Sequence, residues 1–166
     1  MLENDGQTIL YRPTTNYANG DLAVVHEMLE HPNTLIGLGD GGAHVGVMCD
    51  ATDMAHTISY WTRDRTRGPK HRLEDMVRRL TSANADAIGL ADRGRIQTGL
   101  RADMNIIDYD ALNLQLPKVH YDLPAGGKRL LQQAKGIDVT LVAGQPVWRD
   151  GKATGALPGR LLRSGA

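Results

Sequence analysis

The 166-residue chain contains no phenylalanine, a single cysteine and no excess of charge of either sign. With Cys49 as the only cysteine, neither an intrachain disulfide nor a thiolate metal cluster can form. Nineteen basic side chains balance nineteen acidic ones, so no electrostatic argument favours a nucleic acid or an anionic membrane as partner. No apolar run approaches the roughly 20 residues of a membrane-spanning helix, and the first ten residues lack the basic-then-apolar order of a signal peptide. We therefore expect a cytoplasmic protein that binds neither nucleic acid nor membrane.

Aliphatic residues supply most of the apolar content, because 41% of the chain is hydrophobic and only 4% is aromatic. This composition is typical of a packed protein and not of a disordered one. Helical spacing of the apolar residues, with cap and stop signals at the ends, dominates the first ninety residues. It predicts helices over Asp21–Glu30, Thr52–Trp61, 71–82 and 82–90.

The pattern changes after residue 90, where glycine turns separate short β-branched runs. "MNIIDY" (residues 104–109) predicts a strand. The segments 139–143 and 146–149 predict a hairpin that turns at Gly144-Gln145. We therefore expect an α/β part over residues 1–90 and an all-β part over residues 91–166.

One short stretch, "LIGLGDGGAH" (residues 35–44), runs from an apolar segment into a carboxylate. The apolar segment Thr34–Gly39 does not alternate with polar residues, which is typical of a parallel strand buried on both faces. Asp40 follows directly, at the position where α/β sheets and barrels place their sites. Gly41 and Gly42 let the backbone turn tightly beside it. The alternative is that Asp40 is an ordinary solvated turn residue.

Two longer motifs, "HPNTLIGLGDGGAH" and "RLTSANADAIGLADRGRIQTGLRADMNIIDYD", together resemble the C-terminal portion of the amidohydrolase superfamily. The likeness is to its N-acyl-D-amino-acid deacylase (D-aminoacylase) branch, and the segment from "YDLPAGGKRLL" onward resembles the end of such proteins. The resemblance implies that residues 1–90 form the last strand and helices of a TIM-type (β/α) metallo-hydrolase barrel. Residues 91–166 would then form strands of a small, incomplete β-sandwich domain.

The resemblance also implies roles for the residues around Asp40. In the superfamily an aspartate at the end of barrel strand eight borders a zinc-type site, takes a proton from the metal-activated water and returns it to the leaving amine. Asp40 would therefore be both catalytic residue and metal ligand. Gly41, Gly42 and His44 would line the substrate, with an exposed loop histidine as the alternative for His44. The reaction implied is hydrolysis of a C–N bond other than a peptide bond, plausibly in a small N-acyl-D-amino acid.

The basic cluster "WTRDRTRGPKHR" offers partners for the carboxylate of such a substrate. Arg63 and Arg65 are the candidates, because arginine binds carboxylates in a bidentate manner. The alternative is a solvated loop.

Three other residue sets are interpreted as structural, and one of them, Asp108 and Asp110, consists of turn residues at a strand end. Asp50, Asp53 and His56 have the spacing of a small metal site, but helix surfaces carry such pairs routinely. Cys49 is interpreted as a small buried side chain, because nothing in the sequence supplies a base to activate it.

The metal ligands that the superfamily brings from its earlier strands have no counterpart here, since none of the six histidines forms a His-x-His pair. We therefore expect zinc or another divalent metal in the complete enzyme, and no tightly bound metal in this chain alone. The partner would be the N-terminal amidohydrolase portion or a second copy of the chain. The alternatives are an inactive truncated fragment and an interaction module.

Overall fold

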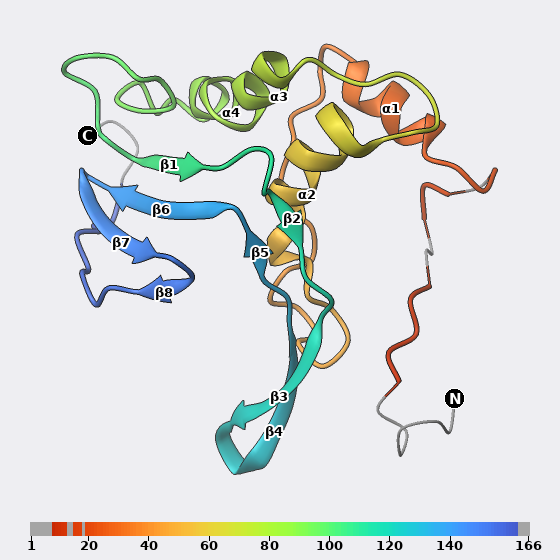
Figure 1. Ribbon diagram of the computed structural model, residues 1–166. Helices are drawn as coiled ribbons and strands as arrows, with labels where there is room; N and C mark the ends of the chain where they lie inside the picture. The colour runs from red at the N-terminus through yellow and green to blue at the C-terminus, as the bar shows by residue number, and fades with distance from the viewer. Residues whose placement is uncertain (1–7, 13–14, 18, 163–166) are drawn as a thin grey trace. The chain divides into compact units, whose positions relative to one another are not determined.

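The computed structural model describes residues 8–12, 15–17 and 19–162, and the chain divides into two units, 1–34 and 35–166 (Figure 1). The first unit holds one helix, α1 (Ala23–Glu30). The predicted helix is confirmed, but its N-cap is Leu22 and not Asp21, and no side chain caps it. Asp21 lies one residue earlier, and its Oδ1 accepts a hydrogen bond of 2.9 Å from the Ala23 amide. The division into residues 1–90 and 91–166 stays a prediction.

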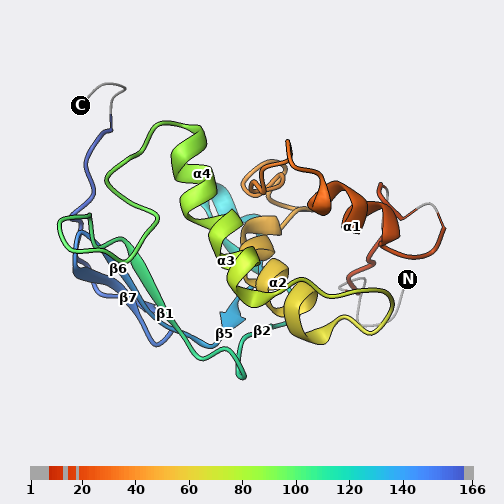
Figure 2. The same ribbon diagram turned by 90° about the horizontal axis from the view of Figure 1, so that it is seen from above.

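Helices form the first half of the second unit. The predicted helix over Thr52–Trp61 is confirmed, but it continues as one turn of π-helix beyond its expected end. None of the described helices is both long and apolar enough to cross a bilayer. The elements are the 3₁₀ turn η2 (Asp50–Thr52), α2 (Asp53–Ser59), the π-helix η3 (Tyr60–Asp64), α3 (Leu73–Leu80) and α4 (Ser82–Ala87). Of these, α3 lies between α2 and α4 (Figure 2).

The buried side chains of this helical layer come from the apolar faces of its helices. Met76 of α3 is fully buried, whereas acidic residues begin that helix and two arginines end it. This charge order suits the helix dipole. Trp61, Ala55 of α2 and Ala85 of α4 complete the buried apolar set of the layer. The apolar residues whose helical spacing predicted these helices are thus among the residues through which the helices pack.

A four-stranded antiparallel sheet follows, in the order β1-β6-β7-β8. The predicted strand at 104–109 and the predicted hairpin are confirmed, although the hairpin turns one residue earlier than expected. Ala143 and Gly144 form the turn with φ of 51° and 75°, as the two-residue turn that suits the twist of a hairpin requires. The strands are β1 (Met104–Ile107), β6 (Ile137–Val142), β7 (Gln145–Arg149) and β8 (Lys152–Ala153).

A long two-stranded ribbon, which the sequence analysis did not find, leaves and re-enters this part of the chain between β1 and β6 (Figure 1). In the part of the ribbon next to the sheet, β2 pairs with β5. In the outer part, β3 pairs with β4, and the short helix η4 connects these two strands. All these pairings are antiparallel. The elements are β2 (Asn113–Leu114), β3 (Lys118–Leu123), η4 (Pro124–Gly126), β4 (Gly127–Leu131) and β5 (Ala134–Lys135).

The predicted strand over Thr34–Gly39 is wrong. The structure assigns no strand there, and Leu35 and Leu38 are 54% and 57% exposed. Only Ile36 is buried, and its carbonyl accepts a hydrogen bond of 2.8 Å from Asn84 Nδ2. A strand needs at least one neighbouring strand with which to exchange hydrogen bonds, and the described part of the chain supplies none for this segment. Helices and strands are both present, as an α/β class requires, but the described pairings confirm neither the barrel nor the sandwich.

Gly136 joins the ribbon to the sheet, and its replacement by Ala should destabilise the chain strongly. Its φ is +82°, and an added Cβ would lie 2.6 Å from the Leu112 amide nitrogen and 2.8 Å from the Asp108 carbonyl oxygen. Gly151 is the matched control, because its φ of +76° is similar but a Cβ there meets nothing within 4 Å. We expect Gly151→Ala to cost about 1 kcal/mol of the free energy of unfolding, and Gly136→Ala at least ~2 kcal/mol more, in urea titrations. Equal losses for the two variants would show that the backbone around Leu112 yields freely.

Candidate functional site

The loop that carries Asp40 is a tight turn, as its glycines predict. The Ala43 amide donates a hydrogen bond of 2.9 Å to the Asp40 carbonyl. Gly42 and His44 both lie in the left-handed region, with φ of 94° and 46°. A glycine adopts this conformation without strain, whereas a histidine does so at a cost. The loop is therefore bent sharply between Asp40 and His44.

Contacts on both sides of His44 hold the end of this loop. The His44 carbonyl accepts hydrogen bonds from the amides of Val47 (2.8 Å) and Met48 (3.1 Å). The Val45 carbonyl accepts one of 2.7 Å from Leu130 of β4. The ribbon, which begins more than sixty residues later in the sequence, thus holds the end of the loop through this hydrogen bond. Sequence reasoning had no signal for this long-range contact.

The side chains of Asp40 and His44 both face solvent. Among the described residues, no hydrogen bond or ion pair engages the Asp40 carboxylate, so it is free to accept a proton or to bind a ligand. The structure therefore places Asp40, Gly41, Gly42 and His44 together on one loop, and among the described residues no hydrogen bond or ion pair links the Asp40 carboxylate to Arg63 or Arg65.

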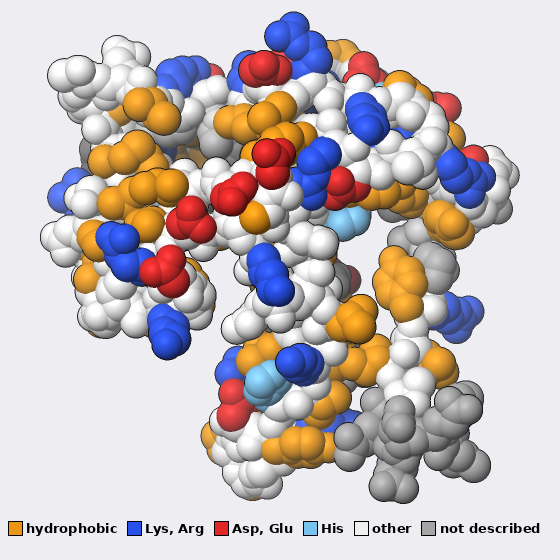
Figure 3. Space-filling view, viewed as in Figure 1, with side chains coloured by type: hydrophobic (Ala, Val, Ile, Leu, Met, Phe, Trp, Pro, Cys, Tyr) orange, Lys and Arg blue, Asp and Glu red, His pale blue; other side chains and the backbone are white. Residues whose placement is uncertain are grey.

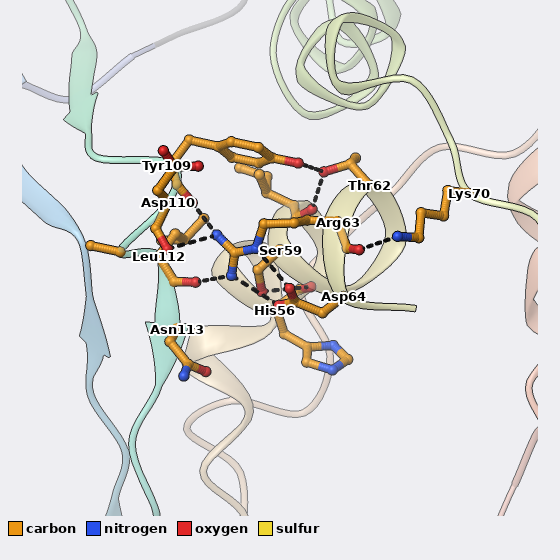
Figure 4. Close-up of polar contacts among 12 residues, drawn as sticks. His56, Ser59, Thr62, Arg63, Asp64, Lys70, Tyr109, Asp110, Leu112 and Asn113 are labelled. Carbon is orange, nitrogen blue, oxygen red and sulfur yellow. Dashed lines mark hydrogen bonds and ion pairs between the residues drawn. The ribbon is translucent and has the colours of Figure 1, made fainter. Parts of the chain in front are cut away.

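Arg63, at the end of η3, uses all five of its N–H donors within the chain (Figure 4). Nε and Nη2 donate to the two carboxylate oxygens of Asp64, at 2.7 and 2.9 Å. Nη1 donates to the carbonyls of Tyr109 and Asp110, and Nη2 also donates to that of Leu112 at 2.6 Å. An arginine has five such donors in a fixed fork, so none is left for a substrate.

Further contacts strengthen the link between η3 and the segment 109–112. Thr62 Oγ1 and the Tyr109 hydroxyl share a hydrogen bond of 2.7 Å, and the Arg63 guanidinium lies 5.3 Å from the centre of the Tyr109 ring. The hydrogen bond from Arg63 lowers the pKa of Asp64, and the same bond raises the pKa of Arg63. This geometry is typical of a structural arginine, and the substrate-binding role of Arg63 stays a prediction that it does not support.

Arg65 is buried, with 4% of its surface exposed. Its guanidinium stacks 4.5 Å from the Trp61 ring, and its Nε is buried without a hydrogen-bond partner. Gly68 covers it closely, because a Cβ there would lie 2.6 Å from Arg65 Nη2. A substrate carboxylate has no open path to this group in the structure, so its predicted role likewise gains no support.

Taken by itself, the second unit does not complete a zinc site with its described side chains. A zinc ion takes three or four protein ligands, and among the described side chains of the second unit no three His, Cys, Asp or Glu groups converge. His56 instead stacks on Tyr60, with ring centres 5.1 Å apart, and burial lowers its pKa despite the nearby Asp53 and Asp64. The side chain of Asp50 lies outside the described part. Asp40 is thus a single potential ligand.

A cleft of about 820 Å³ opens between α2, the ribbon and the four-stranded sheet, where Figure 3 shows the surface hollowed. Its walls combine Trp148 with several amide side chains, including Gln115 and Gln132. None of the predicted site residues lines it. Its size falls in the range of ligand pockets, but Gln132 is already bonded to Thr52 Oγ1 and to the Gln115 carbonyl.

Comparison with known proteins identifies the family. A model described as "Amidohydrolase family" matches residues 9–148, which is most of the chain. The chain belongs to the amidohydrolase family. This confirms the resemblance drawn from the motifs around Asp40 and from the segment that follows α3.

Two curated relatives of this amidohydrolase chain have different activities. A D-aminoacylase of Alcaligenes xylosoxydans xylosoxydans is 32% identical over 105 residues, which are 63% of this chain and 19% of that protein. A 5-methylthioadenosine/S-adenosylhomocysteine deaminase of Nitratidesulfovibrio vulgaris is 29% identical over 162 residues, 93% of this chain and 34% of that protein. The chain therefore spans between about a fifth and a third of the length of these relatives.

Solved structures of a D-aminoacylase are also similar. One, described as defining a novel subset of amidohydrolases, is 28% identical with a TM-score of 0.44, over 62% of this chain and 19% of that one. Another with the same scores concerns the binuclear metal centre of D-aminoacylase.

Proposed function

We propose that this chain is the C-terminal portion of a metal-dependent amidohydrolase that hydrolyses the amide bond of a small N-acyl-D-amino acid. The single observation that carries the proposal is the family match, which includes the loop with Asp40. The D-aminoacylase relative supports the substrate class. The products would be a carboxylate and a free D-amino acid.

Asp40 is the residue that we propose for proton transfer. Amide hydrolysis needs a base that takes a proton from the attacking water and then returns it to the leaving nitrogen. An exposed carboxylate without an internal partner is suited to both steps, and Asp40 is held on a loop anchored by Val45. The metal of such an enzyme activates the water, and among the described side chains of the second unit we propose only Asp40 as a ligand for it.

The remaining ligands would come from another part of the amidohydrolase polypeptide. Two observations favour such a partner. Asp40 is one ligand where zinc needs three or four. In addition, twenty-one large hydrophobic side chains of the described residues are exposed, against eight hydrophobic residues that are buried. A surface with so much apolar area is typical of a protein that packs against further polypeptide.

A second candidate is deamination of an adenine nucleoside. It is favoured by the deaminase relative, whose match covers 93% of this chain. Deamination also replaces a C–N bond by attack of water, so the role of Asp40 would be the same. An inactive fragment or an interaction module would turn over neither substrate, so activity on either one distinguishes both candidate functions from these alternatives.

The experiment joins the chain to the rest of an amidohydrolase polypeptide and measures both reactions. We expect release of free D-amino acid from N-acetyl-D-amino acids, loss of this activity with a chelator, and its return with zinc. The isolated chain should hold far less than one zinc per molecule by elemental analysis. Turnover of 5-methylthioadenosine alone would favour the deaminase, and a tightly held stoichiometric zinc in the isolated chain would contradict the ligand count.

A further inference from the structure

The outer strand of the ribbon, β3 (Lys118–Leu123), has one edge without a partner. It pairs with β4 on one side only, and no other described strand joins this two-stranded sheet. Five of its six residues are exposed. Figure 3 shows charged, histidine and hydrophobic side chains together on this arm. An edge of this kind is a template for a further strand.

The backbone of β3 presents its bonding groups on that free edge. Leu130 of β4 donates its amide to Val45 and therefore points away from β3. Val119 stands opposite Leu130, so its own N–H and C=O point away from β4, towards the open side. After His120 the register shifts, and no β4 residue stands opposite Tyr121 or Asp122.

The sequence of β3 is complementary to itself. When two copies run antiparallel with His120 at the two-fold axis, Lys118 lies opposite Asp122 of the partner subunit and Val119 lies opposite the partner's Tyr121. Opposite charges, and an aromatic paired with a β-branched side chain, are favourable cross-strand pairs. Arg129 binds Asp122 through both carboxylate oxygens, at 2.7 Å each, and that contact keeps the pKa of Asp122 low. The Asp122 carboxylate is therefore already paired with Arg129 of its own chain, and Lys118 of the partner subunit would add a second cation to it.

The other open edges lack this complementarity. An antiparallel pairing of β1 with a second β1, centred between Asn105 and Ile106, places Asp103 opposite the partner's Asp108, and like charges in that position repel. The β8 strand has only two residues. The free edge of β4 already donates to Val45.

We propose that β3 is a homodimer interface in which two copies of this chain pair their β3 edges antiparallel about His120. The result is a continuous four-stranded sheet, β4-β3-β3-β4, across an isologous contact. This surface is independent of the proposed enzymatic function, because it involves neither Asp40 nor a metal.

The dimer is tested first by sedimentation of the 166-residue chain over a dilution series. Lys118→Asp places two aspartates opposite each other twice in the dimer, and we expect at least a tenfold rise in the dimer dissociation constant. Lys152→Asp is the matched control, because it makes the same charge change on the exposed edge strand β8. We expect it to leave the dissociation constant within about twofold. A monomer at all concentrations overturns the proposal, as does an equal effect of the two variants.

Cross-linking then tests the register, in a Cys49→Ala background. Residues at the two-fold centre of this pairing are opposite each other with Cα atoms about 4.5 Å apart, within disulfide range. His120→Cys should therefore form a dimer disulfide under mild oxidation, and Lys152→Cys should not. Tyr121→Cys should cross-link much less, because Tyr121 lies opposite Val119 of the partner subunit, and the partner's Tyr121 is two positions further along the strand. A dimer in which His120→Cys fails to cross-link overturns this interface and points to another surface.

Discussion

Replacement of Asp40 by Asn in the complete amidohydrolase is expected to lower kcat by about 10²–10⁴-fold, the usual contribution of general acid–base catalysis. The amide keeps the size and shape of the side chain but can no longer take a proton from water. The carboxylate has no internal hydrogen bond among the described residues, so the fold should not change. KM should therefore move much less than kcat.

The control for Asp40→Asn is Asp110→Asn, which makes the same chemical change at another exposed loop residue. The Arg63 contact at Asp110 uses the backbone carbonyl, which this substitution keeps. We expect wild-type kcat for it, and matching thermal unfolding for both variants. If Asp40→Asn keeps kcat within threefold of wild type, Asp40 is not the proton-transfer residue.

The elements that could be predicted from the sequence are those defined by local signals. α1, α2 and α3 have apolar residues at helical spacing, and the β6–β7 hairpin has a glycine turn between β-branched runs. Each of these signals lies within about ten residues, so no distant contact is needed to recognise it. The hairpin turn was misplaced by one residue because Ala143, not only Gly144, adopts positive φ.

The segment Thr34–Gly39 shows why the rest could not be predicted. Its apolar composition is correct for a buried parallel strand, but a strand exists only when a neighbour accepts its hydrogen bonds. The described residues offer none, and the segment forms no strand. The β3–β4 ribbon could have been predicted, because "LPAGG" (residues 123–127) is a turn signal between two possible strands.

In the candidate site, too, local features could be predicted and long-range contacts could not. The sharp turn between Asp40 and His44 follows from adjacent glycines, and the structure shows it. The contacts of Arg63 join residues 46 to 49 positions apart. No local pattern distinguishes such an arginine from a substrate-binding one, because both have the same side chain next to polar loop residues.

Replacement of Arg63 by Ala should lower the free energy of unfolding by about 2–4 kcal/mol. A hydrogen bond to a charged group contributes roughly 1.5–3 kcal/mol, and a buried acceptor that loses its donor costs about 1–3 kcal/mol. Arg63 serves three backbone carbonyls of residues 109–112, but its side chain is 25% exposed, so water compensates in part. The expected loss of unfolding free energy is therefore well below the sum for three fully buried hydrogen bonds.

Two further variants separate the geometry of Arg63 from its charge. Arg63→Lys keeps the charge but replaces the planar fork by a single ammonium group, so we expect about half the loss of Arg63→Ala. Arg72→Ala is the control, because Arg72 is 77% exposed and its one ion pair, with Glu74, spans 3.6 Å. Exposed pairs of this kind contribute little, so its stability should stay within about 0.5 kcal/mol of wild type in the same urea titrations.

Hydrogen exchange shows whether the loss of stability in Arg63→Ala is confined to the contact between η3 and the segment 109–112. Without Arg63, the hydrogen bond that remains between η3 and the segment 109–112 among the described residues is the one between Thr62 and Tyr109, so the amides of this segment should exchange faster in Arg63→Ala under native conditions. Amides of β6 and β7 should keep their protection, because the four-stranded sheet has its own pairing. An Arg63→Ala chain as stable as the Arg72→Ala control, with unchanged exchange at residues 109–112, would mean that Arg63 does not join the helical layer to the strands. The guanidinium would then be open again to a role in binding the substrate carboxylate.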